Sequence, residues 1–262
     1  SVNNLFLAGA LPGCLIGIMF ILYSTWHCKQ RGFGRMAPVP MKDRVIMGRQ
    51  AIWALMIPVI VLGGIFCGLC TATEAAAVAA LYSGLLGFFK YKKLHMRDLP
   101  GIFLNTARSS AQIMFIISTA SFFQYVLLKT RIPEMVVRQV AEVFSSMAPV
   151  IIAIIVLLLI MGCFMEGTAI LLITVPIFVP IAKAFNYDIL QLAVVMCISL
   201  AAGVITPPVG LNLYVLSSIT EEKVMRIANE AVPFVIIMAV VAILCAFIPQ
   251  LSLFLPSVLG TA

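Results

Sequence analysis

Residues 189–220 read ILQLAVVMCISLAAGVITPPVGLNLYVLSSIT, a stretch of 32 residues without a charged side chain. A transmembrane helix needs roughly 20 mainly apolar residues, so this stretch is long enough to enter a bilayer. Pro207 and Pro208 remove two backbone donors in its middle and clash with the preceding turn, while Gly203 and Gly210 add flexibility on both sides. The stretch therefore predicts two half-helices with an unwound joint near mid-membrane.

The remainder of the chain is similarly apolar. Of 262 residues, 63% are hydrophobic and 10% are charged, whereas soluble domains are about 45–50% apolar and about 25% charged. A soluble fold of this length could not bury so much apolar surface, because its water-facing exterior needs polar residues. Barrel strands alternate over about 10 residues and give no continuous apolar runs. We therefore predict an all-α polytopic integral membrane protein, whose other long charge-free stretches are 1–28, 51–73, 109–128, 143–165 and 231–262.

Basic residues cluster in two segments, 29–49 and 90–108. The positive-inside rule assigns both segments to the cytoplasm. The segment 51–89 supplies the two spans that must then separate them, with a turn near 68–73. These segments account for much of the net charge of +7, so no nucleic-acid partner is expected. The predicted elements outside the breaks are spans at 5–26, 51–68, 73–89, 109–128 and 231–250, a basic loop at 27–50, interfacial helices at 94–108 and 131–146, a charged loop or surface helix at 221–230, and a Pro-rich tail.

A second interruption lies within residues 147–182, where Glu166 stands between Gly162 and Gly167. The arm after Glu166 has only 16 apolar residues, 167–182, which favours a re-entrant helical hairpin over two full spans. Such backbone is tolerated at membrane depth only where protein or water covers it. An ionisable residue in an apolar run is a functional hypothesis by default. Glu166 is therefore either an ion-site residue or a solvated residue at the hairpin tip.

Unwound joints expose carbonyls and helix ends that attract ions. Hydroxyl and amide groups accompany both interruptions, with Thr168 at the first and Thr206 and Asn212 at the second. Sodium prefers hard oxygen ligands, which carbonyls and threonine hydroxyls supply without a buried anion. The two interruptions together predict an ion site, although a Pro kink can also be purely structural.

Enzyme chemistry finds little support in the sequence. Cys67 and Cys70 form a CxxC pair, but their surroundings are apolar and no second pair offers a metal site. We interpret them as packing residues, and a membrane thiol enzyme is the minor alternative. Thr71 or Thr73 can cap a helix that begins near Glu74, with Glu74 favourable in its first turn, and an ion-path role of Glu74 is the alternative. No hydrolase, ATPase or dinucleotide-binding motif is present, so we predict that the chain is not an enzyme and has no cofactor.

Four motifs, in order, resemble the large membrane subunit of tripartite ATP-independent periplasmic (TRAP) transporters. They are GGIFCGLCTATEAAAVAALY at 63–82, GCFMEGTAILLITVPIFVPIA at 162–182, GVITPPVGLNLYV at 203–215 and IPQLSLFLP at 248–256. The resemblance covers essentially all residues. Two positions depart from the family pattern: Ala72 replaces a proline, and Glu166 stands where aspartate is usual.

The resemblance implies an elevator-type ion transporter fold built from two inverted repeats, each with a hairpin and a broken helix. The chain starts with Ser1, so we expect that the first repeat is largely missing. The implied domains are 1–50 as the last span of the first repeat with the basic cytoplasmic loop, 51–146 as scaffold spans and interfacial helices, 147–230 as the re-entrant hairpin and broken helix of the transport domain, and 231–262 as the last span and tail.

The resemblance also implies the function. It predicts a sodium-coupled permease subunit in the bacterial inner (cytoplasmic) membrane that imports organic acids of the C4-dicarboxylate or sialic-acid type. Implied partners are a small four-helix membrane subunit and a periplasmic substrate-binding protein. The alternative is a related sodium-coupled anion transporter that works without a binding protein.

Sodium and substrate would bind where the hairpin tip meets the joint, with sodium held by Thr206 and the backbone of Gly162 and Gly210. The implied site residues are Gly162, Met165, Glu166, Thr168, Gly203, Thr206, Pro207, Pro208, Val209, Gly210 and Asn212.

Overall fold

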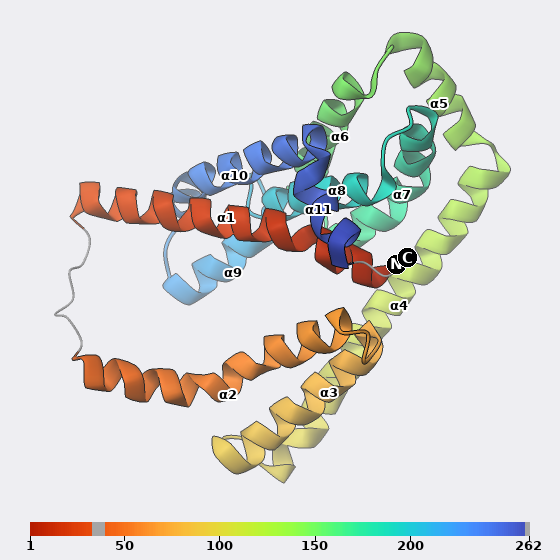
Figure 1. Ribbon diagram of the computed structural model, residues 1–262. Coiled ribbons are helices and arrows are strands. Elements are labelled where there is room, and N and C mark those ends of the chain that lie inside the picture. The colour runs from red at the N-terminus through yellow and green to blue at the C-terminus, as the bar shows by residue number, and fades with distance from the viewer. Residues whose placement is uncertain (33–39, 260–262) are drawn as a thin grey trace. The chain divides into compact units, whose positions relative to one another are not determined.

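The structure is a computed structural model that describes residues 1–32 and 40–259, with the side chains at positions 50 and 259 outside the description (Figure 1). Every regular element in this range is a helix and no described residue lies in a strand, which confirms the all-α prediction. Five stretches are long and apolar enough to cross a membrane, and α2 (Met41–Phe66) makes a sixth if its two parts are one span. The prediction of a polytopic membrane protein is confirmed.

The chain forms two compact units. Unit 1 comprises Ser1–Asn3 and Thr25–Ala111, and unit 2 comprises Asn4–Ser24 and Gln112–Ala262. Two long helices, α1 (Val2–Arg31) and α4 (Leu99–Lys129), contribute residues to both units.

Unit 1 is built on a hairpin of α2 and α3 (Ala72–Leu85), which pack against each other (Figure 1). Thr71 begins α3 with a capping box: its backbone N–H donates to Glu74 Oε2 at 2.7 Å, and its hydroxyl accepts from the Glu74 N–H at 3.4 Å. This confirms the prediction that Thr71 caps the helix with Glu74 in its first turn. A π-helical turn, η1 (Leu86–Lys90), continues α3, and a short 3₁₀ helix, η2 (Met96–Asp98), leads into α4.

Unit 2 centres on α8 (Ile189–Gly203), which packs against both α6 (Met147–Gly162) and α10 (Val224–Phe247). Ten of its 15 residues are buried, so most of the surface of α8 is covered by neighbouring helices. Helices inside a bilayer gain little hydrophobic energy from pairing, so close packing and small residues hold them together. The remaining helices of this unit are α5 (Ile132–Val143), α7 (Gly167–Ala184), α9 (Leu211–Thr220) and α11 (Pro249–Leu259).

Three predicted boundaries are wrong. The interfacial helix at 94–108 is not separate from the span at 109–128, because the single helix α4 runs from Leu99 to Lys129. Pro100 lies in the first turn of this helix, where its missing N–H costs nothing, and no proline follows to interrupt it.

The second wrong boundary is the basic loop 27–50, since α1 continues to Arg31 and α2 already begins at Met41. Lysine, arginine and glutamine are good helix formers, so charge alone does not end a helix. The part of this loop at 33–39 lies outside the described residues.

The third wrong boundary concerns the last span, because α10 begins at Val224 and includes most of the segment predicted as 221–230. The Pro-rich tail also contains a helix, α11, whose Pro249 occupies the first position.

Candidate functional site

The first helix break lies between α6 and α7. Helix α6 ends at Gly162, and α7 begins at Gly167 after a turn of four residues. Glu166 caps α7 with both carboxylate oxygens: Oε1 accepts from the Thr168 hydroxyl at 2.9 Å and Oε2 accepts from the Ala169 N–H at 3.2 Å. Glu166 is exposed. Its carboxylate therefore holds the start of α7 in place.

The second break separates α8 from α9 and confirms the predicted interruption. Helix α8 ends at Gly203, and α9 begins at Leu211, so no continuous helix runs through the Pro-Pro pair. Thr206 donates its hydroxyl hydrogen to the Ala202 carbonyl at 2.7 Å. Gly210 caps α9 with a φ of +52°, a left-handed conformation that suits glycine.

The two breaks touch each other. A Cβ atom on Gly162 would lie 2.8 Å from the Gly203 Cα, and one on Gly203 would lie 2.7 Å from the Gly162 Cα. No side chain fits between these backbones. The Gly210 N–H also donates to the Cys163 carbonyl at 3.0 Å. The hairpin turn and the joint of the broken helix therefore form one connected site within unit 2.

This site presents free backbone oxygens. Among the described residues, the five successive carbonyls from Ile205 to Val209 accept no hydrogen bond, and neither does the Gly162 carbonyl. The Gly210 carbonyl accepts one bond, from the Leu213 N–H at 2.7 Å. Pro208 is exposed and the other four residues of this run are partly buried. Backbone carbonyls are strong acceptors that pair with a donor or cation where one is available. The arrangement is suited to a cation with hard oxygen ligands.

The structure brings some predicted site residues together and not others. Gly162, Gly203 and Gly210 meet at the contact, with Thr206, Pro207, Pro208 and Val209 on the joint between them. Asn212 is exposed, and its N–H lies 3.4 Å from the Val204 carbonyl. Met165 and Glu166 lie on the exposed hairpin turn and Thr168 lies in the first turn of α7, and within the described chain no hydrogen bond connects these three residues to 203–212.

Sequence analysis missed one participant, Cys163. Its carbonyl joins the two breaks, and its thiol donates to the Leu159 carbonyl at 3.1 Å. Because the decisive group is backbone, no side-chain pattern could identify this position.

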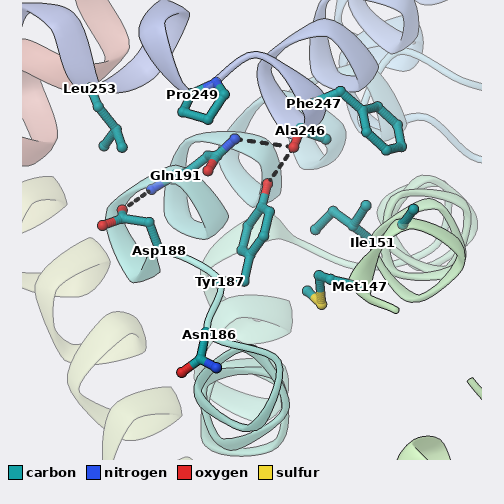
Figure 2. Close-up of a pocket in the computed structure, with 11 residues that line it drawn as sticks. Met147, Ile151, Asn186, Tyr187, Asp188, Gln191, Ala246, Phe247, Pro249 and Leu253 are labelled. Carbon is teal, nitrogen blue, oxygen red and sulfur yellow. Dashed lines mark hydrogen bonds between the residues drawn. The ribbon is translucent and has the colours of Figure 1, made fainter. Parts of the chain in front are cut away.

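A hollow of about 410 Å³ in unit 2 lies at the other end of α6 from the helix breaks (Figure 2). Gln191 donates its side-chain N–H groups to the carbonyls of Cys245 and Ala246, at 2.8 and 3.0 Å, and the Tyr187 hydroxyl also donates to Ala246 at 2.9 Å. Burial, with smaller effects of Cys245 and Asp188, raises the pKa of Tyr187, so this hydroxyl stays a donor.

None of the predicted site residues lines this hollow. Fifteen residue steps at about 1.5 Å each place Met147, on its wall, roughly 22 Å along α6 from Gly162. The hollow is therefore separate from the helix breaks.

The cysteines give no sign of redox or metal chemistry. All seven are free thiols, and no group of three or more His, Cys, Asp or Glu side chains suited to a metal occurs in the part of the chain that the structure describes. The arrangement at the breaks therefore remains the best candidate for function.

Comparison with known proteins identifies the family. The family model described as "Tripartite ATP-independent periplasmic transporter, DctM component" matches residues 1–251. The chain is 37% identical to the C4-dicarboxylate TRAP transporter large permease protein DctM of Pseudomonas aeruginosa, over 99% of this chain and 61% of that protein. It is 32% identical to the sialic acid TRAP transporter large permease protein SiaM of Vibrio cholerae, over 98% of this chain and 60% of that protein.

A third relative is the isethionate TRAP transporter permease protein DctMQ of Oleidesulfovibrio alaskensis, 33% identical over 97% of this chain and 40% of that protein. The chain thus spans about 60% of the length of the DctM and SiaM relatives. The chain belongs to the DctM-component family of tripartite ATP-independent periplasmic transporters, a family of transporter permeases and not of enzymes.

Proposed function

We propose that this chain forms part of the permease subunit of a sodium-coupled secondary transporter that imports organic acids, of the C4-dicarboxylate or sialic-acid type. The names of two relatives support these substrate classes. The observation that carries the proposal is the contact between Gly162 and Gly203, which brings two helix breaks and their free carbonyls together.

Sodium would bind at the joint. Its ligands would come from the carbonyls between Ile205 and Val209, the Gly162 carbonyl and the Thr206 hydroxyl oxygen. That hydroxyl donates its hydrogen to Ala202, so its lone pairs remain able to face a cation. The remaining lone pair of the Gly210 carbonyl offers a further ligand. Sodium in this position would hold the hairpin turn against the broken helix.

The substrate carboxylate would bind next to the ordered joint. The N-terminal end of α9 lies at the joint, has no side-chain cap and carries partial positive charge. Met165 on the hairpin turn, Thr168 at the start of α7 and Asn212 on α9 would line its path. Because sodium must first order both breaks, carboxylate uptake would depend on the sodium gradient.

The proposed system includes two partners, a small four-helix membrane subunit and a periplasmic substrate-binding protein, in the bacterial inner membrane. A relative named as the combined permease DctMQ supports a second membrane component. Co-purification of the complete permease with such a small subunit tests this part of the proposal.

The sodium site is tested by Thr206→Val in the complete permease with its partners in proteoliposomes. We expect the sodium concentration for half-maximal uptake of a C4-dicarboxylate to rise about tenfold, because one oxygen ligand is lost. Thr206→Ser keeps the hydroxyl and should retain most of the sodium affinity.

Thr174→Val is a matched control, since the Thr174 hydroxyl donates to the Ile170 carbonyl at 2.8 Å in the same manner, away from the breaks. This variant should leave the sodium dependence unchanged. Equal sodium dependence in Thr206→Val and the unmodified protein would remove Thr206 from the site.

A further inference from the structure

In α2 and in η1, which continues α3, the sequence changes from apolar to basic at the same height in unit 1. Arg49 on α2 is the last charged residue before the charge-free stretch 51–73, and Lys90 at the end of η1 is the first after 75–89. The Tyr82 hydroxyl donates to the Trp53 carbonyl at 3.0 Å, which fixes the two helices side by side at this height. The boundary between lipid tails and headgroups therefore falls here on both helices.

The π-helical turn places Lys90 over Trp53. The Lys90 ammonium lies 5.1 Å from the centre of the indole ring, within the range of a cation–π contact. The Tyr91 N–H closes the turn on the Leu86 carbonyl at 2.8 Å. Such π-turns often occur at functional sites. The π-helical turn and the Trp53 indole ring therefore position the Lys90 ammonium group.

A hollow of about 380 Å³ lies at this point, lined by Ile46, Arg49, Trp53 and Lys90. Its two cations come from different helices, and within the described ranges neither forms an ion pair with a carboxylate. Two positive charges facing one hollow repel each other. An anion between them would relieve that repulsion.

Apolar surface continues from the hollow toward the charge-free stretches. Ile52 and Leu55 on α2 are 54% and 62% exposed, and Phe89 on η1 is 75% exposed. Ile46 and the Trp53 ring add apolar wall at the hollow itself. The ligand must therefore combine an anionic head with long apolar chains.

We propose that this hollow binds the phosphate group of an anionic phospholipid, with Arg49 and Lys90 holding the phosphate and the acyl chains lying along α2 and η1. Basic pockets between transmembrane helices bind anionic headgroups in this way. The indole sits at the interface and shapes the entrance. The bound lipid would bridge α2 and α3 and stabilise their hairpin.

Native mass spectrometry of the complete permease in detergent tests this site, with dioleoyl phosphatidylglycerol as the probe and dioleoyl phosphatidylcholine as the neutral comparison. The double variant Arg49→Gln/Lys90→Gln should bind phosphatidylglycerol roughly 30-fold more weakly, because two cations near the headgroup are lost. The matched control Lys42→Gln/Lys93→Gln removes the same charge from exposed positions outside the hollow and should change binding less than about threefold.

Three results would overturn the proposal. They are equal loss of binding in the two double variants, equally tight binding of phosphatidylcholine, and displacement of phosphatidylglycerol by excess inorganic phosphate, which would make free phosphate the ligand. Unchanged melting temperatures of the lipid-free variants would show that both fold, so loss of binding could not be attributed to unfolding.

Discussion

At the scale of single residues, small size matters more than side-chain chemistry at the site. Gly162 and Gly203 allow two backbones to approach so closely that a methyl group on either would overlap the other. Gly210 combines a left-handed backbone with a hydrogen bond across the two breaks. The polar side chains Glu166 and Thr206 bond within their own segments. The shape of the site therefore depends on the absence of side chains at these glycines.

Replacing Gly162 tests this contact. Gly162→Ala should destabilise the complete permease by about 1–3 kcal/mol, because the new Cβ meets Gly203 backbone that cannot turn aside. Gly167→Ala is the control, since nothing lies within 4 Å of its Cβ position. Thermal unfolding in detergent measures both. A Gly162→Ala protein as stable as the Gly167→Ala protein would show that the breaks do not touch.

Glu166 is predicted to act mainly by capping α7. Glu166→Ala should cost about 0.5–2 kcal/mol in thermal unfolding, because the Ala169 N–H loses its acceptor. Glu166→Gln keeps an oxygen acceptor and should preserve both stability and sodium-dependent uptake. If Glu166→Gln instead loses sodium dependence at unchanged stability, the charge of the carboxylate belongs to the ion site.

At the scale of elements, α8 is held at both ends. Its C-terminal end contacts the hairpin turn through Gly203. Its N-terminal end is capped by Asp188, which accepts from the Gln191 N–H at 2.9 Å, and Gln191 in turn reaches the last carbonyls of α10. The break after Gly203 therefore starts from a fixed helix, whereas α9 beyond it has only one buried residue, Leu213.

Gln191 is the side chain that fixes the N-terminal end of α8 to the end of α10. Gln191→Leu preserves the volume but leaves the Cys245 carbonyl without its donor in a buried position, so we expect a loss of about 1–3 kcal/mol. Tyr187→Phe should cost less, about 0.5–1.5 kcal/mol, because Gln191 still donates to Ala246. Thermal unfolding of the complete permease separates the two. A reversed order would assign the anchor to Tyr187.

At the scale of the whole molecule, charge distribution determines orientation in the membrane. Basic residues gather at the α2 and η1 ends of the unit 1 hairpin, and the turn between α2 and α3 carries none. Positively charged segments remain on the cytoplasmic side. The hairpin turn should then face the opposite side of the membrane.

Cysteine labelling tests this orientation in a cysteine-free version of the complete permease. Leu69→Cys lies at an 82% exposed position in the turn and should react with a membrane-impermeant maleimide added outside the cell. Lys92→Cys, just beyond η1, should react only after the membrane is opened. Labelling of Lys92→Cys in intact cells would reverse the assigned topology.

Sequence alone predicted the features that depend on local chemistry. Consecutive prolines at 207 and 208 interrupt a helix whatever surrounds them, and long charge-free runs cannot be buried in a soluble fold of this length. The cap at Thr71 and both helix breaks followed from such local rules. Local patterns also misled, because the charged residues near the ends of α1, α4 and α10 do not interrupt those helices.

Only the tertiary structure decided which distant groups meet. Gly162 and Gly203 lie on different helices, and their approach results from the packing of α6 on α8. The Cys163 carbonyl, the Gln191 anchor and the position of Lys90 over Trp53 are likewise contacts between elements. These contacts depend on how whole helix surfaces fit together. Inside a bilayer, helices associate through close packing and not through the burial of apolar surface that a sequence pattern predicts.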